Sequence, residues 1–324
     1  MHANGSHPTT VGAPGGAQPS YPGPVTVTIT TRMLAPTEWL ERAAAHAERA
    51  DALTAARRER RSRGEKDPVE DFLFEYYPIR PGKLARWHPG AGVVLSDDGD
   101  TAVRQELAVR AGWRWHTRTP DGGVTLDLPA YLADRDAGVR WLDDLLRRTA
   151  ERPAHLGCLG LHEWAMVYRQ REHRHELPLR LGQERTDAVV ESHPVRCSHF
   201  DAFRFFTEPA RPLNRTQPTR ATQPDLEQPG CLHANMDLLK AGNLLGPACP
   251  GELMLDCFEL ARDIRVLDMR ASPYDFRELG HEPVAIETTA GRAEYVAQQR
   301  AFAERAAPLR TRLLEVTGLL LHAD

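Results

Sequence analysis

Lysine is scarce in this chain and long apolar runs are absent, and both features limit what the protein can be. The sequence has three lysines (Lys66, Lys83 and Lys240) among 41 basic residues, so arginine carries nearly all of the positive charge. The formal net charge is −4. Proteins that bind nucleic acid mainly through its phosphates usually have a surplus of positive charge, which this chain lacks. A local basic groove remains compatible with this net charge. No segment approaches the roughly 20 apolar residues of a membrane span, and no secretory signal is recognisable. We therefore expect a cytoplasmic protein without a membrane partner.

Common catalytic motifs are missing as well. No GxGxxG or GxxxxGK(S/T) phosphate loop, no GxSxG elbow and no HExxH pair occurs, which argues against nucleotide-dependent and hydrolase chemistry of those kinds. The five cysteines form no CxxC pair, which favours reduced thiols over a disulfide framework. Cys197 stands two residues before His199 and makes a thiol–imidazole pair only if the fold brings both side chains together.

The order of patterns predicts a mainly α protein with a minor β component in the N-terminal half, and an α+β arrangement stays open. Residues 1–24 are poor in large apolar groups, which predicts a disordered tail. Residues 25–324 are expected to form a single globular domain, with 151–324 as its functional half. Alternation over 25–29 predicts a strand, and the Gly-Gly pair at 122–123 predicts a hairpin. Helices are expected from Thr37, as N-cap, towards residue 61, and over 134–150, 232–245, 251–271 and 290–320, with a kink at Pro308.

Histidines are concentrated in one part of the chain. Six of the fourteen lie between residues 162 and 233. His233 and Asp237 stand four residues apart, which places them on one face of a helix. Imidazole and carboxylate ligands suit zinc and iron(II). A candidate metal set is therefore His193, His199, Asp201 and His233.

The same region also fits a plain structural role. Ser198 and Asp201 have the spacing of a helix capping box, with Ser198 as N-cap. The polar segment 210–231 follows, and a segment this long without periodicity is usually functional or disordered. If it runs over a pocket, it offers three guanidinium groups to an anionic ligand. These belong to Arg211, Arg215 and Arg220.

Several stretches between residues 65 and 315 form a recognisable pattern. They read DFLFEYYPIRPGKLARWHPG, LHEWAMVY, TDAVVESHPVRCSHFDAFRFF, ARPLNRTQPTR, QPGCLHANMDL, LDMRASPYD and AEYVAQQRAFAERAAPLR. Together they resemble a family of proteins from GC-rich actinobacteria whose members commonly carry the label 3-methyladenine DNA glycosylase. The chain departs from the pattern after HANMDL, where Leu239, Lys240 and Ala241 replace a Tyr-Lys-Trp run.

The resemblance implies a DNA glycosylase of base excision repair that hydrolyses the N-glycosidic bonds of alkylated purine bases, with DNA as partner and no cofactor. Such an enzyme extrudes a nucleotide, stacks its base on aromatic groups and supplies a carboxylate that activates water or stabilises positive charge on the sugar. The catalytic residues implied are Asp201, Asp237, His199 and His233. The substrate-binding residues implied are Trp164, Tyr168, Phe203, Arg204, Arg211 and Arg220.

Two alternatives stay open. The first is a cytosolic metal-dependent enzyme of small-molecule metabolism, which uses the His/Asp cluster between residues 193 and 237 to hold Zn or Fe. The second is a non-enzymatic helical binding module, in which the buried polar cluster only specifies the core. Sequence spacing does not decide among the three, because the convergence of separate segments depends on the fold.

Overall fold

The computed structural model describes residues 31–173 and 176–322. The tail predicted over 1–24 and the strand predicted over 25–29 lie outside these residues. The structure is 59% helical with one small sheet in the N-terminal half, which confirms the prediction of a mainly α protein with a minor β component. Among the described helices, none combines the length and the apolar character needed to cross a membrane.

The N-terminal part is built on a four-stranded sheet with the order β1-β2-β4-β3. β1 (Arg32–Leu34) pairs in parallel with β2 (Val93–Leu95), and β2 pairs antiparallel with β4 (Val124–Leu126). β3 (His116–Arg118) and β4 form the predicted hairpin. A separate small core joins the sheet to α1 (Pro36–Ser62) and α4 (Thr101–Ala111). Its buried residues are Leu34, Trp39, Trp87, Leu95, Val103, Leu107 and Val124.

The start of α1 differs from the prediction by two residues. Ala35, not Thr37, is the N-cap, and Pro36 occupies the first helical position. Proline suits that position because its fixed φ is already helical and its missing N–H would have no partner in the helix. Two short helices follow, α2 (Phe72–Tyr76) and α3 (Pro81–Leu84).

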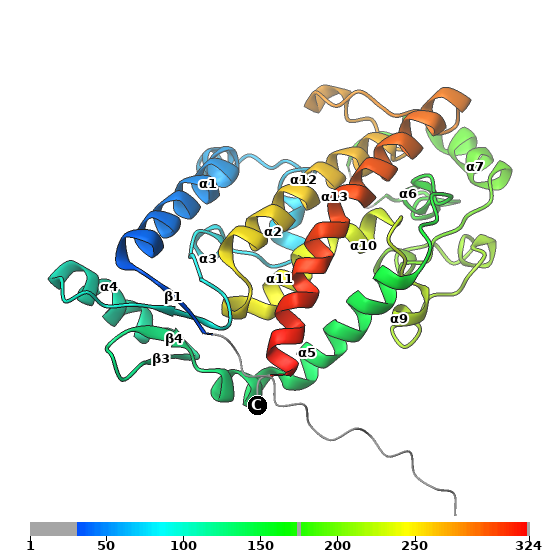
Figure 1. Cartoon of the computed structure of the whole chain (residues 1–324). Helices are drawn as coiled ribbons and strands as arrows, with labels where there is room; N and C mark the ends of the chain where they lie inside the picture. Colours follow the sequence, from blue (N-terminus) through cyan, green and yellow to red (C-terminus); the bar gives the residue numbers. More distant parts are fainter. Residues whose placement is uncertain (1–30, 174–175, 323–324) are drawn as a thin grey trace, which may run out of the picture.

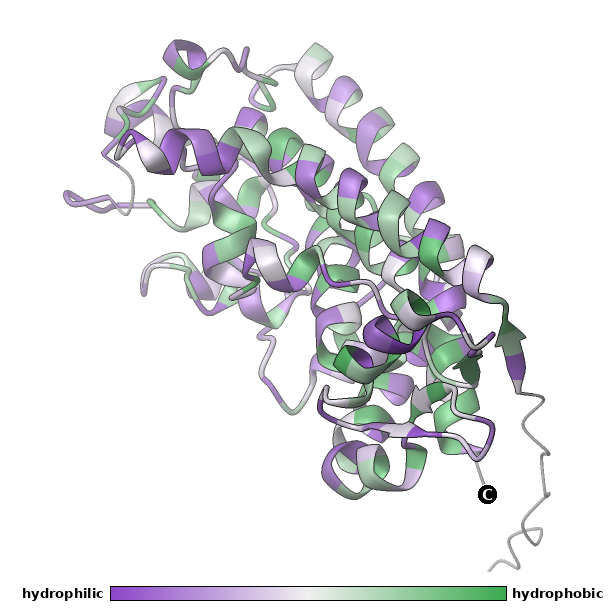
Figure 2. Ribbon diagram, turned by 90° about the vertical axis from the view of Figure 1, so that its left-hand side faces the viewer, coloured by the Kyte–Doolittle hydropathy of each residue, from purple (hydrophilic) through white to green (hydrophobic). Residues whose placement is uncertain are grey.

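Three long helices form the body of the molecule (Figure 1). α13 (Thr289–Leu321) packs along both α5 (Leu128–Glu151) and α12 (Gly251–Ala271). The helices predicted over 251–271 and 290–320 are therefore confirmed, and Pro308 lies inside α13. Along most helices in Figure 2, hydrophobic and hydrophilic residues alternate, which is the pattern of helices with one buried face.

Buried side-chain hydrogen bonds tie α13 to the rest of the body. Arg310 donates to Asn235 Oδ1 at 2.6 Å, and the Gln299 amide donates to the Gly230 carbonyl at 2.6 Å. Thr317 donates to Asp143 Oδ1 on α5 at 2.7 Å. Each bond satisfies a polar group that burial would otherwise leave costly.

The segment between α5 and α12 carries short helices joined by long loops. The helix predicted over 232–245 is interrupted at Asp237, which separates α10 (Leu232–Met236) from α11 (Leu238–Leu245). The predicted capping box does not form. His199 is the N-cap of α8, and its Nδ1 accepts from the Ala202 amide at 3.3 Å. The remaining elements are α6 (Leu161–Ala165), α7 (Gly182–Ser192), η1 (Arg211–Leu213), α9 (Gln223–Leu226), η2 (Gly246–Ala248) and η3 (Arg277–Leu279).

Candidate active site

A cluster of buried acids and histidines lies where α6, α8, α10, α11 and α12 meet. None of its members exposes more than 14% of its side chain, so each must be paired to avoid a large desolvation cost. The acids are Glu163, Asp201, Glu227, Asp237 and Asp268. The histidines are His162, His199 and His233.

A lysine joins two of the aspartates. Lys240 Nζ lies 2.8 Å from Asp201 Oδ2 and 3.6 Å from Asp237 Oδ2. Tyr77 donates a hydrogen bond to Asp237 Oδ1 at 2.8 Å. Burial opposes the charge of both aspartates, but Lys240 outweighs it at Asp201, and His199 together with Lys240 outweighs it at Asp237, so both pKa values are lowered. The pKa of Lys240 is raised by the aspartates despite its burial. This group is therefore an ionised Asp–Lys–Asp arrangement at neutral pH.

Two arginines extend the arrangement towards solvent. Arg204 Nε lies 3.3 Å from Asp201 Oδ1, and Arg220 approaches the same oxygen to 3.8 Å. The two side chains are 45% and 56% exposed, so they keep much of their contact with water. They are placed to meet an anionic group that arrives from outside.

His199 lies on the inner side of this arrangement. Its Nε2 is 3.1 Å from Glu227 Oε1 and 3.5 Å from Asp237 Oδ2. Burial disfavours the imidazolium, but the two carboxylates outweigh it and raise the pKa to about 10. The Ala202 amide at Nδ1 acts in the opposite direction, because a nitrogen that accepts this bond carries no proton. The position of both contacts orients the ring, whichever protonation state it holds.

A second histidine connects a thiol with a buried carboxylate. His162 Nδ1 lies 3.3 Å from Cys158 Sγ, and Nε2 lies 2.9 Å from Asp268 Oδ1. Burial disfavours protonation of His162, but Asp268 and Cys158 outweigh it and raise its pKa. The ring of His233 packs edge-on against His162 with centroids 4.6 Å apart, and lies 5.3 Å from the ring of His199. Burial, together with His162, lowers the pKa of His233 to about 3, which keeps it neutral.

An open cavity of about 600 Å³ leads to this cluster. Phe72, Tyr76 and Phe205 form aromatic walls, and Phe72 and Tyr76 stack with centroids 5.0 Å apart. Its polar lining includes Asp201, Lys240, Arg204, Arg220 and Glu75. A narrow annex of about 40 Å³ shares the aromatic walls and Asp201, and reaches Glu163, His233 and Arg265. The annex has room for roughly three water molecules, at 10–15 Å³ each. We call the larger space the aromatic cavity.

The structure brings together the four side chains expected to be catalytic. Asp201 lines the aromatic cavity and His233 lines its annex. Asp237 and His199 lie immediately behind them, joined to the cavity through Lys240. His233 and Asp237, which were predicted to share one helix face, do not pair with each other. Asp237 contacts His199, and His233 contacts the two neighbouring histidine rings.

The side chains expected to bind substrate divide into two groups. Arg204 and Arg220 line the aromatic cavity, and Arg211 is exposed beside them, with its guanidinium 3.5 Å from the Arg204 carbonyl. The aromatic side chains instead belong to the core. Trp164 is fully buried and donates to the Ala271 carbonyl, and the buried side chains of Tyr168 and Phe203 are not among those that line the aromatic cavity.

The four residues predicted as metal ligands are not brought to one point. His193 contacts Arg292 and the Val189 carbonyl, away from the cluster. Among the described residues, two other sets have ligand atoms within 4.8 Å of one another. Arg265 lies 3.6 Å from Asp268 in the first set and Lys240 lies 3.6 Å from Asp237 in the second, and each cation competes with a metal for its carboxylate. The sets are His162, Glu163, His233 and Asp268, and His199, Glu227 and Asp237.

Sequence reasoning missed several members of the cluster. A charged pair, His162 and Glu163, inside an apolar run was one available signal, since such groups are rarely buried without a partner. The rarity of lysine was another, because Lys240 is one of three in the chain. Asp268 pairs with Arg265 within its own helix and also with His162, and nothing in the spacing pointed to Glu227 or Cys158.

Comparison with known proteins identifies no relative. No protein-family model, no curated protein and no solved structure matches the chain. The function is therefore inferred from the geometry of the site.

Proposed function

We propose that the protein is a glycosylase-like hydrolase that releases alkylated purine bases from DNA. The observation that carries the proposal is the aromatic cavity lined by Asp201 and Lys240, with Asp237 behind them as the second ionised carboxylate paired with Lys240. Flat aromatic walls suit a base that has been turned out of the helix. An ionised carboxylate suits the positive charge that develops on the sugar when the N-glycosidic bond breaks.

The protonation states favour a substrate that leaves without a general acid. Lys240 lowers the pKa of Asp201 against burial, His199 and Lys240 do the same for Asp237, and burial keeps His233 neutral with a pKa of about 3. None of the three therefore acts as a general acid at neutral pH, and the raised pKa values of Lys240 and His199 make both of them poor proton donors there. An N-alkylated purine already bears a positive charge and departs without protonation. Unmodified purines lack that charge, so the same site discriminates against them.

The arginines at the rim of the aromatic cavity favour a nucleic acid as the source of the base. Arg204 and Arg220 flank the cavity, and Arg211 lies next to them on the surface. Guanidinium groups bind phosphate oxygens with matched geometry. A cationic rim around an aromatic pocket thus fits a nucleotide whose base enters and whose phosphates stay outside.

The direct test is base release from DNA treated with a methylating agent. We expect the wild-type protein to release 3-methyladenine or 7-methylguanine, measured by chromatography. Asp201→Asn and Asp237→Asn should each slow release roughly 10²- to 10³-fold, as removal of one transition-state electrostatic group does elsewhere. Asp51→Asn is the matched control, because Asp51 is an exposed aspartate paired with Arg58.

Binding provides an independent readout. Arg211→Ala and Arg220→Ala should each weaken DNA binding and reduce the log–log salt slope by about 0.9. The aspartate variants should bind DNA at least as well as the wild type, since they remove negative charge. A wild-type protein that neither binds DNA at low salt nor releases a base would overturn the proposal.

A metal-dependent enzyme is the second candidate, favoured by one observation. Asp268 Oδ2 is buried without a hydrogen-bond partner in the described structure, next to His162 and His233. If a metal occupies this set, protein dialysed against Zn²⁺ or Fe²⁺ should retain one ion, and His233→Ala should lose it. Ligand histidines must be neutral, so the affinity should fall as the pH drops. Full base release after EDTA treatment and metal removal would refute this candidate.

A further inference from the structure

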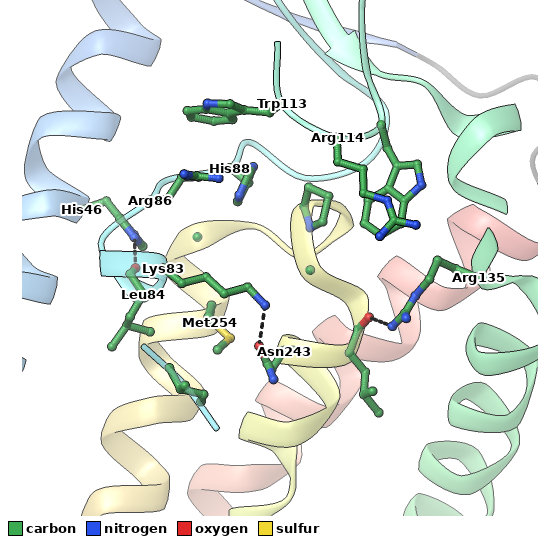
Figure 3. A pocket seen from close by; sticks show the side chains of 17 residues that line it. His46, Lys83, Leu84, Arg86, His88, Trp113, Arg114, Arg135, Asn243 and Met254 are labelled. Atoms are coloured by element: carbon green, nitrogen blue, oxygen red, sulfur yellow. Dashed lines mark hydrogen bonds between the residues drawn. The ribbon is translucent and has the colours of Figure 1, made fainter. Parts of the chain in front are cut away.

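A second pocket lies between the N-terminal sheet and the helical body (Figure 3). It has a volume of about 430 Å³, which is within the range of small-molecule sites. Side chains from α1, α3, α5, α11 and α12 and from the loops after α3 and α4 line it. We call it the basic pocket, after its charged residues Lys83, Arg86, Arg114 and Arg135.

The charge of the basic pocket is not balanced. No aspartate or glutamate is among the described residues that line it. Arg114 pairs with Asp134 at its edge. For Lys83, Arg86 and Arg135, the described structure contains no carboxylate within ion-pair distance; Lys83 contacts Asn243 and Arg135 contacts the Leu244 carbonyl. Three uncompensated cations facing one space favour an anionic occupant.

The walls of the basic pocket suit a flat ring. Trp113, Trp115, Leu244, Pro247 and Met254 supply its apolar lining. Guanidinium groups pack on both tryptophans: Arg86 and Arg110 lie 4.8 Å and 5.0 Å from the Trp113 ring, and Arg114 lies 4.1 Å from the Trp115 ring. A planar group in the pocket would bury apolar area against this lining.

We propose that the basic pocket binds a phosphate ester of a planar base. The cations of Lys83, Arg86 and Arg135 hold the phosphate, and the apolar lining of the pocket receives the ring. The ligand is either a free nucleotide or one nucleotide of a strand. Asn243 and Leu244 line both this pocket and the aromatic cavity, so a strand could reach both spaces. The proposal does not require the glycosylase activity.

Calorimetric titration with adenosine 5′-monophosphate, at low salt, tests the proposal, with adenosine and inorganic phosphate as the two halves of the probe. We expect the nucleotide to bind more tightly than either half. Lys83→Gln and Arg86→Gln should each weaken it roughly tenfold, the cost of one charged hydrogen bond. Trp113→Leu should weaken adenosine and leave inorganic phosphate nearly unchanged. Lys66→Gln, at an exposed lysine outside the pocket, should bind as the wild type does.

A single-stranded oligonucleotide distinguishes the two sources. Nucleotide binding that depends on Lys83 and Arg86 indicates a free ligand, and oligonucleotide binding alone with the same dependence indicates a strand. Both results support the pocket. No binding of either probe at about 1 mM, or binding that Lys83→Gln and Arg86→Gln leave unchanged, would refute it. So would loss of nucleotide binding in Arg220→Gln, because Arg220 lines the aromatic cavity instead.

Discussion

Replacement of Asp237 by asparagine tests the centre of the cluster most directly. The change keeps the shape of the side chain and removes a negative charge that is 12% exposed. Tyr77 can still donate to the amide oxygen, but Lys240 and His199 lose a charged neighbour. Removal of one partner of a fully buried ion pair costs about 3–5 kcal/mol.

A smaller cost is expected at this position. Lys240 keeps Asp201 at 2.8 Å, and His199 keeps Glu227 at 3.1 Å, so neither group is left without an opposite charge. We therefore expect a loss of about 2 kcal/mol, close to that of one charged hydrogen bond, and a Tm lower by roughly 4 °C. The protein should stay folded, and it should be inactive in base release under the proposed function.

The stability loss in Asp237→Asn should depend on pH. His199 and Lys240 hold the pKa of Asp237 below its unfolded value of 3.8 against the effect of burial. Its contribution is therefore fully present above about pH 4 and is lost as the pH falls below that value. Urea unfolding followed by circular dichroism should show the full difference in the free energy of unfolding between Asp237→Asn and wild type at pH 7, and a smaller difference below pH 4. Asp51→Asn, at an exposed ion pair, should change stability by less than about 0.5 kcal/mol. Equal stability of Asp237→Asn and wild type at pH 7 would refute the reasoning.

Three further predictions concern single residues. Gly251→Ala should destabilise the protein by about 1–3 kcal/mol, because its Cβ would lie 2.7 Å from a tryptophan carbon; an unchanged urea midpoint would contradict this. Lys240 should not form a Schiff base with abasic DNA, since the two aspartates raise its pKa despite burial and keep the amine protonated; a borohydride-trapped complex that Lys240→Gln abolishes would show otherwise. Cys158 should be alkylated first among the five cysteines, because it is partly exposed and the other four are buried. The pKa of the Cys158 thiol is lowered mainly by a hydrogen bond with Cys197 and also by His162. His162→Gln should therefore slow the labelling of Cys158 by iodoacetamide at pH 7, read by mass spectrometry.

The long helices were predictable because local signals agree with the tertiary packing. Pro250 precedes α12, and the apolar spacing within it continues to Ala271, where the helix ends. The hairpin of β3 and β4 follows from the Gly-Gly turn, since Gly122 adopts a φ of +85° that other residues rarely take. Asp237 shows the limit of these local signals. The helical sequence pattern runs unbroken over 232–245 and does not predict the interruption at this residue.

The site was predictable in part. His199 and Asp201 are two residues apart and His233 and Asp237 are four apart, so each pair could be expected to lie in one local region, while the approach of the two pairs depends on the fold. Their partners come from distant elements. Tyr77 reaches Asp237 across 160 positions of the sequence, and such pairings depend on the whole fold, which no local pattern encodes. The aromatic walls were assigned to the wrong rings for the same reason: Trp164 has the size of a stacking platform, but its indole N–H is used inside the core.

The bonds from α13 to the middle of the chain also bear on how the protein is made. Residues 230 and 235 are synthesised well before Gln299 and Arg310, which supply their buried hydrogen-bond partners. Until the later segment arrives, the earlier one has polar groups that the core cannot satisfy, so it cannot close into its final form. Contacts between parts far apart in sequence also slow folding. The cluster therefore should mature late in biogenesis, and a nascent chain stalled before α13 should expose its acids and histidines to solvent and to chaperones.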